Sequence, residues 1–306
     1  MSLPATRRRL LLHIGVAQAG QPSLAAIAAS ARVGLAANGV FTPSSLPGPA
    51  WDQAALATLR AELAASKAAT VLLSDDTLCD RLTDTAAITR LRRQLLDVAD
   101  EVTVLVYLCP QHQAQALAFQ AAILAGDAGR AEQALNGHPW QLDYYARLLP
   151  WADAFGTAAM AVCPIEGDPL TAQITDLSRR LNLVAGTLPT PAAGPRLSPQ
   201  ALLFLANADE GAGAQSAVGR ERADLINALM RAAPGELRLP GNRPAQLAHA
   251  FAGSNARVAQ KYSCGVDGTL FTTPVPDALP TLAPSAQVVA VAANLWRDAL
   301  VAGAVG

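Results

Sequence analysis

Residues 10–23 read Leu-Leu-Leu-His-Ile-Gly-Val-Ala-Gln-Ala-Gly-Gln-Pro-Ser and combine an apolar strand, a glycine-containing loop and the start of an alanine-rich helix. A strand that ends at Gly15, turns through Gly20 and leads into a helix near Ser23 directs unpaired backbone N–H groups and the positive end of a helix dipole at one point. Such an arrangement suits a phosphate group. The expected phosphate contacts are the backbone groups of Gly15, Ala19, Gly20 and Gln21 and the hydroxyl of Ser23.

The same loop contains no basic residue. A loop that supports phosphate transfer usually carries a lysine, which meets the charge that develops on the transferred group. Here the loop offers the neutral amide of Gln18, and Pro22 removes one backbone donor. The sequence therefore predicts a loop of the nucleotide-binding type. The absence of a lysine argues against group transfer at this loop.

Composition and charge narrow the class of protein. The chain has 306 residues, of which 51% are hydrophobic, so it can bury a large core as a globular domain. Its formal net charge of −1 argues against nucleic acid or an anionic membrane surface as partner. Aromatic residues make up only 5%, which argues against a surface for stacking bases.

Four cysteines, at positions 79, 109, 163 and 264, form no closely spaced pair of the kind that binds zinc. We therefore expect no metal site. Their even number permits two disulfides in an oxidising compartment. However, Cys109 and Cys163 lie at the ends of apolar stretches expected to be buried strands, which favours reduced thiols and a cytoplasmic location.

The amino terminus allows a second interpretation. Residues 6–9, Thr-Arg-Arg-Arg, precede three leucines, as in a twin-arginine export signal. The apolar stretch is broken by His13 and Gly15 and is at the lower limit of the roughly 7 to 15 residues of such a signal. We expect a cytoplasmic protein, with export as the alternative. No segment reaches the roughly 20 apolar residues of a transmembrane helix.

Short apolar stretches alternate with helical segments along the first half of the chain. This alternation is typical of a parallel sheet that is covered by helices on both faces. After a Pro-, Gly- and Ala-rich connector at 187–199, the pattern is mainly helical. We expect one domain over residues 1–306, with an α/β core in 1–165 and a mainly helical part in 196–306. The expected strands are 9–15, 69–74, 102–108 and 158–163. A helix is expected from about Ser23 to Asn38, and Asp84 is expected to cap the helix that runs to Asp100.

Several stretches resemble one family when taken together and in order. Leu12-His13-Ile14-Gly15, then Gly20 and Ser23, then Gly39-Val40-Phe41-Thr42-Pro43, resemble the start of bacterial sulfotransferases that use 3′-phosphoadenosine 5′-phosphosulfate (PAPS). Further matches follow in the family's order. They are residues 72–76, Val106-Tyr107-Leu108 with Gln111, Leu142-Asp143-Tyr144-Tyr145, Trp151-Ala152-Asp153, and Ser254-Asn255. The resemblance implies a P-loop NTPase-like, sulfotransferase-like α/β fold.

The resemblance also implies an activity, sulfuryl transfer from PAPS to a hydroxyl of a carbohydrate or similar acceptor. Asp76 falls where the family tends to have a glutamate that acts as base, and a helix-capping role is the alternative for this residue. Gln18 stands at the position of the loop lysine. Cys109, followed by Pro110, replaces an arginine that holds the second phosphate, and a serine of that site falls on about Leu117. His112, Arg130 and Arg257 are the cations that could compensate.

Two interpretations of function follow. In the first, the chain is an active sulfotransferase in which Gln18 stands in for the lysine and Asp76 is the base. In the second, it is a degenerate, non-catalytic relative that binds a ligand or partner in glycan assembly or regulation. A Ser74–His13 hydrolase site is disfavoured because the chain has no Gly-x-Ser-x-Gly elbow. The spacing from Gly15 to Gly20 likewise disfavours a dinucleotide-binding site.

Overall fold

The computed structural model describes residues 7–15, 23–43, 53–66, 68–136, 139–190, 197–202, 204–205, 220–232, 239 and 241–276. The chain divides into two compact units. The first comprises Met1–Pro110, Trp140–Ala192 and Phe251–Thr273, and the second comprises Gln111–Pro139, Ala193–Ala250 and Pro274–Gly306. That these units act as one sulfotransferase-like domain stays a prediction.

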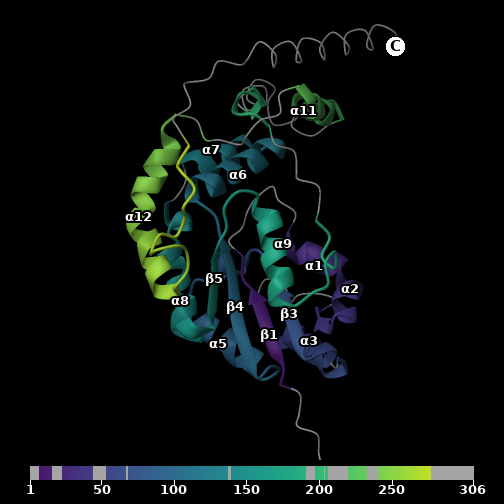
Figure 1. Ribbon diagram of the computed structural model, residues 1–306. Helices are drawn as coiled ribbons and strands as arrows, with labels where there is room; N and C mark the ends of the chain where they lie inside the picture. Colours follow the sequence, from purple (N-terminus) through teal and green to yellow (C-terminus); the bar gives the residue numbers. More distant parts are fainter. Residues whose placement is uncertain are drawn as a thin grey trace, which may run out of the picture. The chain divides into compact units, whose positions relative to one another are not determined.

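The first unit is built on a five-stranded, wholly parallel sheet in the order β2-β3-β1-β4-β5 (Figure 1). The α/β class and the parallel sheet predicted from the sequence are thus confirmed. Because the connections after β1 and β4 leave in opposite directions, the carboxyl ends of these two strands border the switch point where open α/β sheets bind ligands. The strands are β1 (Arg9–His13), β2 (Val40–Phe41), β3 (Thr70–Ser74), β4 (Glu101–Leu108) and β5 (Met160–Pro164).

Strand β2 was not among the expected strands. It is a two-residue edge strand that pairs only with β3, and two residues are too few to show a period. A second difference concerns the helix expected over 23–38, which is interrupted at Ala31 and forms α1 (Leu24–Ser30) and α2 (Arg32–Ala37). The predicted cap at Asp84 is confirmed, since its carboxylate accepts a hydrogen bond of 2.9 Å from the amide of Ala87.

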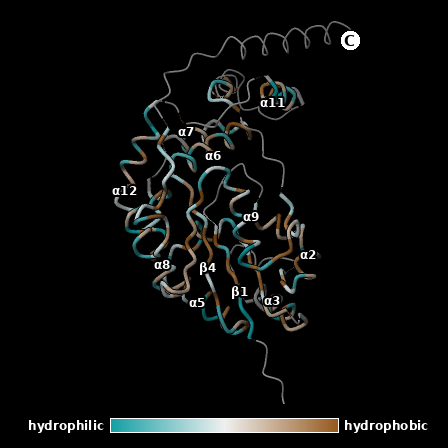
Figure 2. The backbone as a smooth tube through the Cα atoms, viewed as in Figure 1, coloured by the Kyte–Doolittle hydropathy of each residue, from teal (hydrophilic) through white to brown (hydrophobic). Residues whose placement is uncertain are grey.

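One face of the sheet is covered by an apolar layer. Alternate residues of the central strands, such as Leu10, Leu12 and Val104, are fully buried there. Trp151 is fully buried in the same layer and stacks on Phe155 with ring centroids 6.0 Å apart. Figure 2 shows the hydrophobic colouring concentrated along the central strands. The helices that contribute to this layer are α3 (Gln53–Ala65), α4 (Leu78–Arg81), α5 (Thr85–Leu96), α8 (Tyr144–Phe155) and α12 (Arg243–Tyr262).

The opposite face of the sheet meets α1 and α9 (Pro169–Arg180). Two short 3₁₀ helices, η1 (Pro139–Leu142) and η2 (Thr157–Ala159), flank α8. In the first unit, the residues of β1 that point toward α9 include Leu11 and His13, both buried. This face therefore combines apolar packing with polar side chains, which sets it apart from the other.

The second unit contains α6 (Gln111–Leu124), α7 (Ala128–Asn136) and α11 (Arg220–Ala232). Its own apolar core includes Phe119, Ile123, Leu202 and Leu229. The guanidinium of Arg222 donates to the carbonyls of Ile123 and Leu124 at the end of α6. Over the described residues of both units, no helix combines the length and hydropathy needed to cross a membrane.

Candidate functional site

The carboxyl end of β1 is the part of the predicted phosphate-binding loop that the structure describes. Gly15 has a φ of +59°, and a Cβ at this position would lie 2.2 Å from the carbonyl oxygen of Asp76. The amide of Cys79 donates a hydrogen bond of 2.9 Å to the carbonyl of Ile14. The segment that follows β3 therefore crosses directly against Gly15, and both the backbone conformation and the close approach require glycine.

The structure places only part of the predicted site. Gly15, Ser23 and Asp76 lie among the described residues, and the structure brings Ser23 and Asp76 into contact. Gln18, Ala19, Gly20 and Gln21 lie outside the described residues, so their roles stay predictions.

The carboxylate of Asp76 binds the amino end of α1. It accepts hydrogen bonds of 2.5 Å from the Ser23 hydroxyl, 3.1 Å from the amide of Leu24 and 3.2 Å from the amide of Ala25. The Ser23 oxygen in turn accepts a bond of 3.0 Å from Ala26 and is the N-cap of the helix. Asp76 therefore acts as the anion that the dipole and free amides of a helix start attract. This geometry matches the capping interpretation of Asp76.

His13 and Ser74 lie beside Asp76 at the ends of β1 and β3, and both are buried. The His13 Nδ1 and Ser74 Oγ atoms share a hydrogen bond of 2.9 Å, and Asp76 Oδ1 lies 4.0 Å from the same nitrogen. Burial lowers the pKa of His13 despite the opposing field of two nearby carboxylates, so the imidazole is neutral at neutral pH. Because Ser74 and Asp76 approach one ring nitrogen, they do not form a Ser–His–Asp relay, which uses both nitrogens.

The end of β4 is where the resemblance expects an arginine. Cys109 is buried there, and burial raises the pKa of its thiol to about 12. Its carbonyl accepts a hydrogen bond of 2.8 Å from the hydroxyl of Tyr144. The next residue, Pro110, has no backbone N–H group. This position therefore presents a neutral thiol and no charge-assisted donor to an anion.

Of the three cations considered as replacements, Arg257 belongs to the first unit and is engaged there. Its guanidinium lies 4.6 Å from the centre of the Tyr145 ring, and its Nε donates to the carbonyl of Gly253. His112 and Arg130 belong to the second unit, as does Leu117, which is buried. Burial lowers the pKa of His112, which favours its neutral form.

Two stretches quoted for the resemblance meet in the first unit. Ser254 of α12 is buried, and its hydroxyl donates a hydrogen bond of 2.6 Å to Asp143, the N-cap of α8. The same oxygen accepts a bond of 3.2 Å from the amide of Tyr145. Residues separated by more than a hundred positions thus complete one helix start together. Sequence reasoning did not pair them, because neither motif carries information on its partner.

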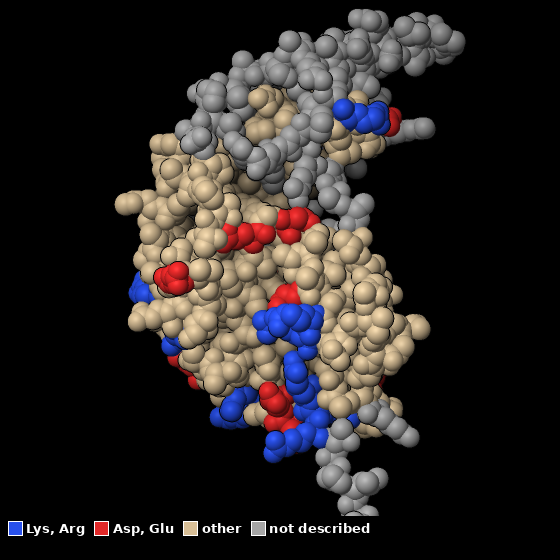
Figure 3. Space-filling view, in the orientation of Figure 1, with Lys and Arg blue, Asp and Glu red and all other residues tan. Residues whose placement is uncertain are grey.

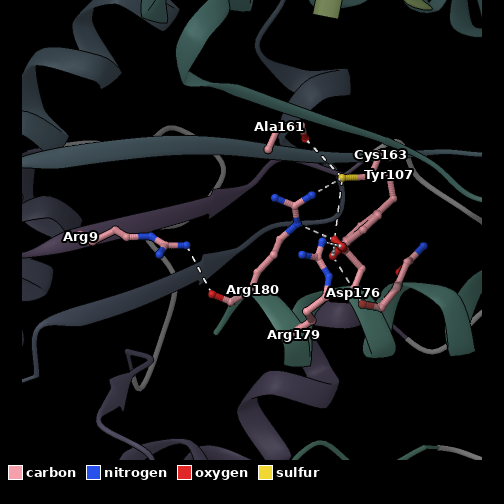
Figure 4. Close-up of polar contacts among 8 residues, drawn as sticks. Arg9, Tyr107, Ala161, Cys163, Asp176, Arg179 and Arg180 are labelled. Carbon is pink, nitrogen blue, oxygen red and sulfur yellow. Dashed lines mark hydrogen bonds and ion pairs between the residues drawn. The ribbon is translucent and has the colours of Figure 1, made fainter. Parts of the chain in front are cut away.

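A further polar cluster lies between α9 and the sheet (Figure 4). Asp176 accepts hydrogen bonds from the hydroxyl of Tyr107 at 3.0 Å, from Arg179 at 2.6 Å and from Arg180 at 2.5 Å. Burial alone would raise the pKa of Asp176, but the bonds from Arg180 and Arg179 outweigh it and hold this pKa below its usual value. The guanidinium of Arg180 also lies 3.0 Å from the sulfur of Cys163.

Both guanidinium groups of this cluster are paired with its one carboxylate, Asp176. Burial raises the pKa of the Cys163 thiol to about 12, so the thiol is protonated and weakly nucleophilic at neutral pH. On the face seen in Figure 3, basic side chains gather over the lower middle with acidic ones beside them, and a separate acidic group lies above. The signal that could have found the cluster is the i, i+4 spacing of Asp176 and Arg180 on a helix. No sequence pattern indicated that Tyr107 on β4 and Cys163 on β5 contact this pair.

The described residues do not fit the anionic groups of PAPS. The first-turn amides of α1 and the Ser23 hydroxyl are bound to Asp76, and the end of β4 offers a buried neutral thiol. A phosphate at α1 would have to displace a carboxylate of the same sign. Compared with known proteins, the chain matches no protein-family model, no curated protein and no solved structure.

Proposed function

We propose that this chain is a non-catalytic, sulfotransferase-like protein that binds a ligand or protein partner in glycan assembly or regulation. The observation that carries the proposal is the position of Asp76, whose carboxylate takes the hydroxyl and two amides that would otherwise face a phosphate group. Hydrogen bonds that involve a charged group are worth about 1.5 to 3 kcal/mol each, so a phosphate that displaced this carboxylate would have to offset their loss.

The kinship itself rests on two kinds of support. The strand order β2-β3-β1-β4-β5 is compatible with a P-loop-like fold. In addition, Ser254 contacts Asp143 and Tyr145, so two separate stretches that resemble the family form one contact. Ordered matches that also meet in space are stronger support than matches in sequence alone.

The charges at the carboxyl edge of the sheet argue against sulfuryl transfer. Sulfuryl transfer leaves a phosphate whose growing negative charge needs a nearby cation. Among the described side chains at the ends of β1 and β3 and just after them, His13 is neutral and Arg81 is paired with Asp75. A neutral amide at Gln18 donates hydrogen bonds but brings no charge. These residues therefore do not supply the positive charge that would compensate the leaving phosphate.

Calorimetric titration with 3′-phosphoadenosine 5′-phosphate tests the proposal. We expect no measurable binding by the wild type, because Asp76 occupies the helix start. Asp76→Asn keeps a side chain that caps helices but removes the charge, and together with Gln18→Lys it should create detectable affinity. Asp84→Asn is the control, since Asp84 is a carboxylate at another helix start, where it is the N-cap of α5. Tight binding by the wild type would contradict the proposal.

A second candidate, the active enzyme, is favoured by one observation. The Asp76 side chain is 26% exposed and lies at the carboxyl edge of the sheet, where a base would face an acceptor hydroxyl. If the chain is an enzyme, it transfers labelled sulfate from PAPS to a carbohydrate, and Asp76→Asn abolishes that transfer while nucleotide binding persists. Absence of transfer together with absence of nucleotide binding by the wild type supports the non-catalytic protein.

A further inference from the structure

The segment that follows α12 has a compact conformation of its own. Val266 and Thr269 form two backbone hydrogen bonds with each other, of 2.9 and 2.8 Å. The residues between them, Asp267 and Gly268, both have positive φ, as in the tight turns of hairpins. Just before it, Gly265 has a φ of +82°, and a Cβ there would lie 2.2 Å from the carbonyl oxygen of Thr269. The shape of this turn is therefore set locally.

The next two residues attach this turn to the first unit. Leu270 is buried in the apolar layer, and Phe271 packs against the same layer. The ring of Phe271 meets that of Tyr144 edge-on, with centroids 6.4 Å apart. The hydroxyl of Tyr144 donates to the carbonyl of Cys109, immediately after β4. Residues 265–273, which we call the strap, therefore lie next to the carboxyl end of β4.

A single carboxylate holds the end of the strap. Glu166 lies two residues after β5, and its Oε1 accepts hydrogen bonds from the amide of Thr272 at 2.6 Å and from its hydroxyl at 3.1 Å. Its Oε2 accepts from both the amide and the hydroxyl of Thr273. Four donors from two successive residues thus converge on one side chain. Both threonines are exposed, so water can replace each of these bonds.

We propose that Glu166 is a clasp that holds the strap closed as a lid beside the carboxyl end of β4. The buried Leu270 seats the strap, whereas the solvent-facing bonds to Glu166 determine how often its end is released. Opening removes Phe271 from Tyr144 and uncovers the chain around Cys109. That is the edge where open α/β sheets bind ligands, so the clasp controls access to it. This inference rests on the contacts of the strap and is independent of whether the chain transfers sulfate.

Alkylation of the four cysteines by iodoacetamide, followed by mass spectrometry of each site, tests the clasp. We expect Glu166→Ala to raise the alkylation rates of Cys109 and Cys264 severalfold. Tyr144 joins Cys109 to the strap, because its hydroxyl donates to the Cys109 carbonyl and its ring meets Phe271, and Cys264 immediately precedes the strap. The rates of Cys79 and Cys163 should stay as in the wild type. Glu101→Ala is the matched control, since Glu101 is an exposed glutamate at the opposite end of β4. It should change none of the four rates.

Two results would overturn the proposal. One is an alkylation rate of Cys109 in Glu166→Ala equal to that of the wild type. The other is an equal increase at all four cysteines, because Glu166 would then stabilise the whole unit. If Glu166→Ala does not fold, amide hydrogen exchange of the wild type shows instead whether the strap opens separately from the sheet. The amides of Thr272 and Thr273 must exchange well before those of β4, and simultaneous exchange of the two segments contradicts a separate lid.

Discussion

The two faces of the sheet in the first unit are stabilised in different ways. On one face, residues such as Leu12, Val104 and Trp151 form a continuous apolar layer. On the other, Tyr107 and Cys163 meet the ion pairs of Asp176 on α9. Apolar burial is non-directional, so the first face tolerates many arrangements of the same volume. The polar contacts fix which residues of α9 lie opposite which residues of the sheet.

The comparison also bears on function. Asp176 on the polar face, Asp76 at the start of α1 and Glu166 after β5 each bind groups of their own chain. Carboxylates that are already saturated by internal donors stabilise the fold and compete with external anions. The polar groups of the first unit thus serve mainly to hold elements together, which agrees with the proposed non-catalytic role.

The largest expected effect concerns the apolar face. Trp151→Ala should lower the free energy of unfolding by about 3 to 5 kcal/mol, because it leaves a cavity under a fully buried ring. Trp140 is the matched control, since its side chain is 48% exposed. Trp140→Ala should change the stability by about 0.5 kcal/mol or less. Urea unfolding followed by far-ultraviolet circular dichroism measures the stability of both variants. Similar losses of stability would contradict the difference expected between a buried and an exposed tryptophan.

A smaller effect is expected on the polar face. Asp176→Asn leaves the half-buried guanidinium of Arg180 without its charged partner and should cost about 1 to 3 kcal/mol. The control is Asp97→Asn, which breaks the Arg60–Asp97 pair, whose side chains are 47% and 61% exposed. That pair should contribute at most about 1 kcal/mol. The same urea titration compares them, and an equal cost for both variants would show that the cluster adds nothing to an ordinary surface pair.

The smallest effect is a dependence on acid pH. The pKa of Asp176 is lowered in the folded state, so its stabilisation is fully present above the unfolded pKa of about 3.9. It is lost as the pH falls through the folded value. The difference in unfolding free energy between wild type and Asp176→Asn should therefore be constant from pH 7 to 5 and shrink below pH 4. A difference that stays constant down to pH 3 would rule out a lowered pKa for this carboxyl.

Local features of the fold were predictable from the sequence because they depend on neighbouring residues. The apolar stretches around Leu10, Leu72 and Val104 predicted buried strands, and Asp84 predicted a helix start. The turn through Gly15 was also predicted, although the contact that requires glycine there was not. The two-residue strand β2 and the interruption at Ala31 were missed, because both are shorter than any period that a sequence can show.

The amino-acid pattern alone was enough to establish the class of the molecule, an α/β chain with a glycine-bearing loop after the first strand and no lysine in that loop. Which side chains meet one another depends on the tertiary fold. Asp76 reaches Ser23 from 53 positions away, Asp143 meets Ser254 across 111, and Glu166 holds Thr272 across 106. The physical reason is that period and propensity encode local conformation and the buried face of each element. The partner of a polar side chain depends instead on the order of the strands and on how distant segments pack, which no local pattern contains.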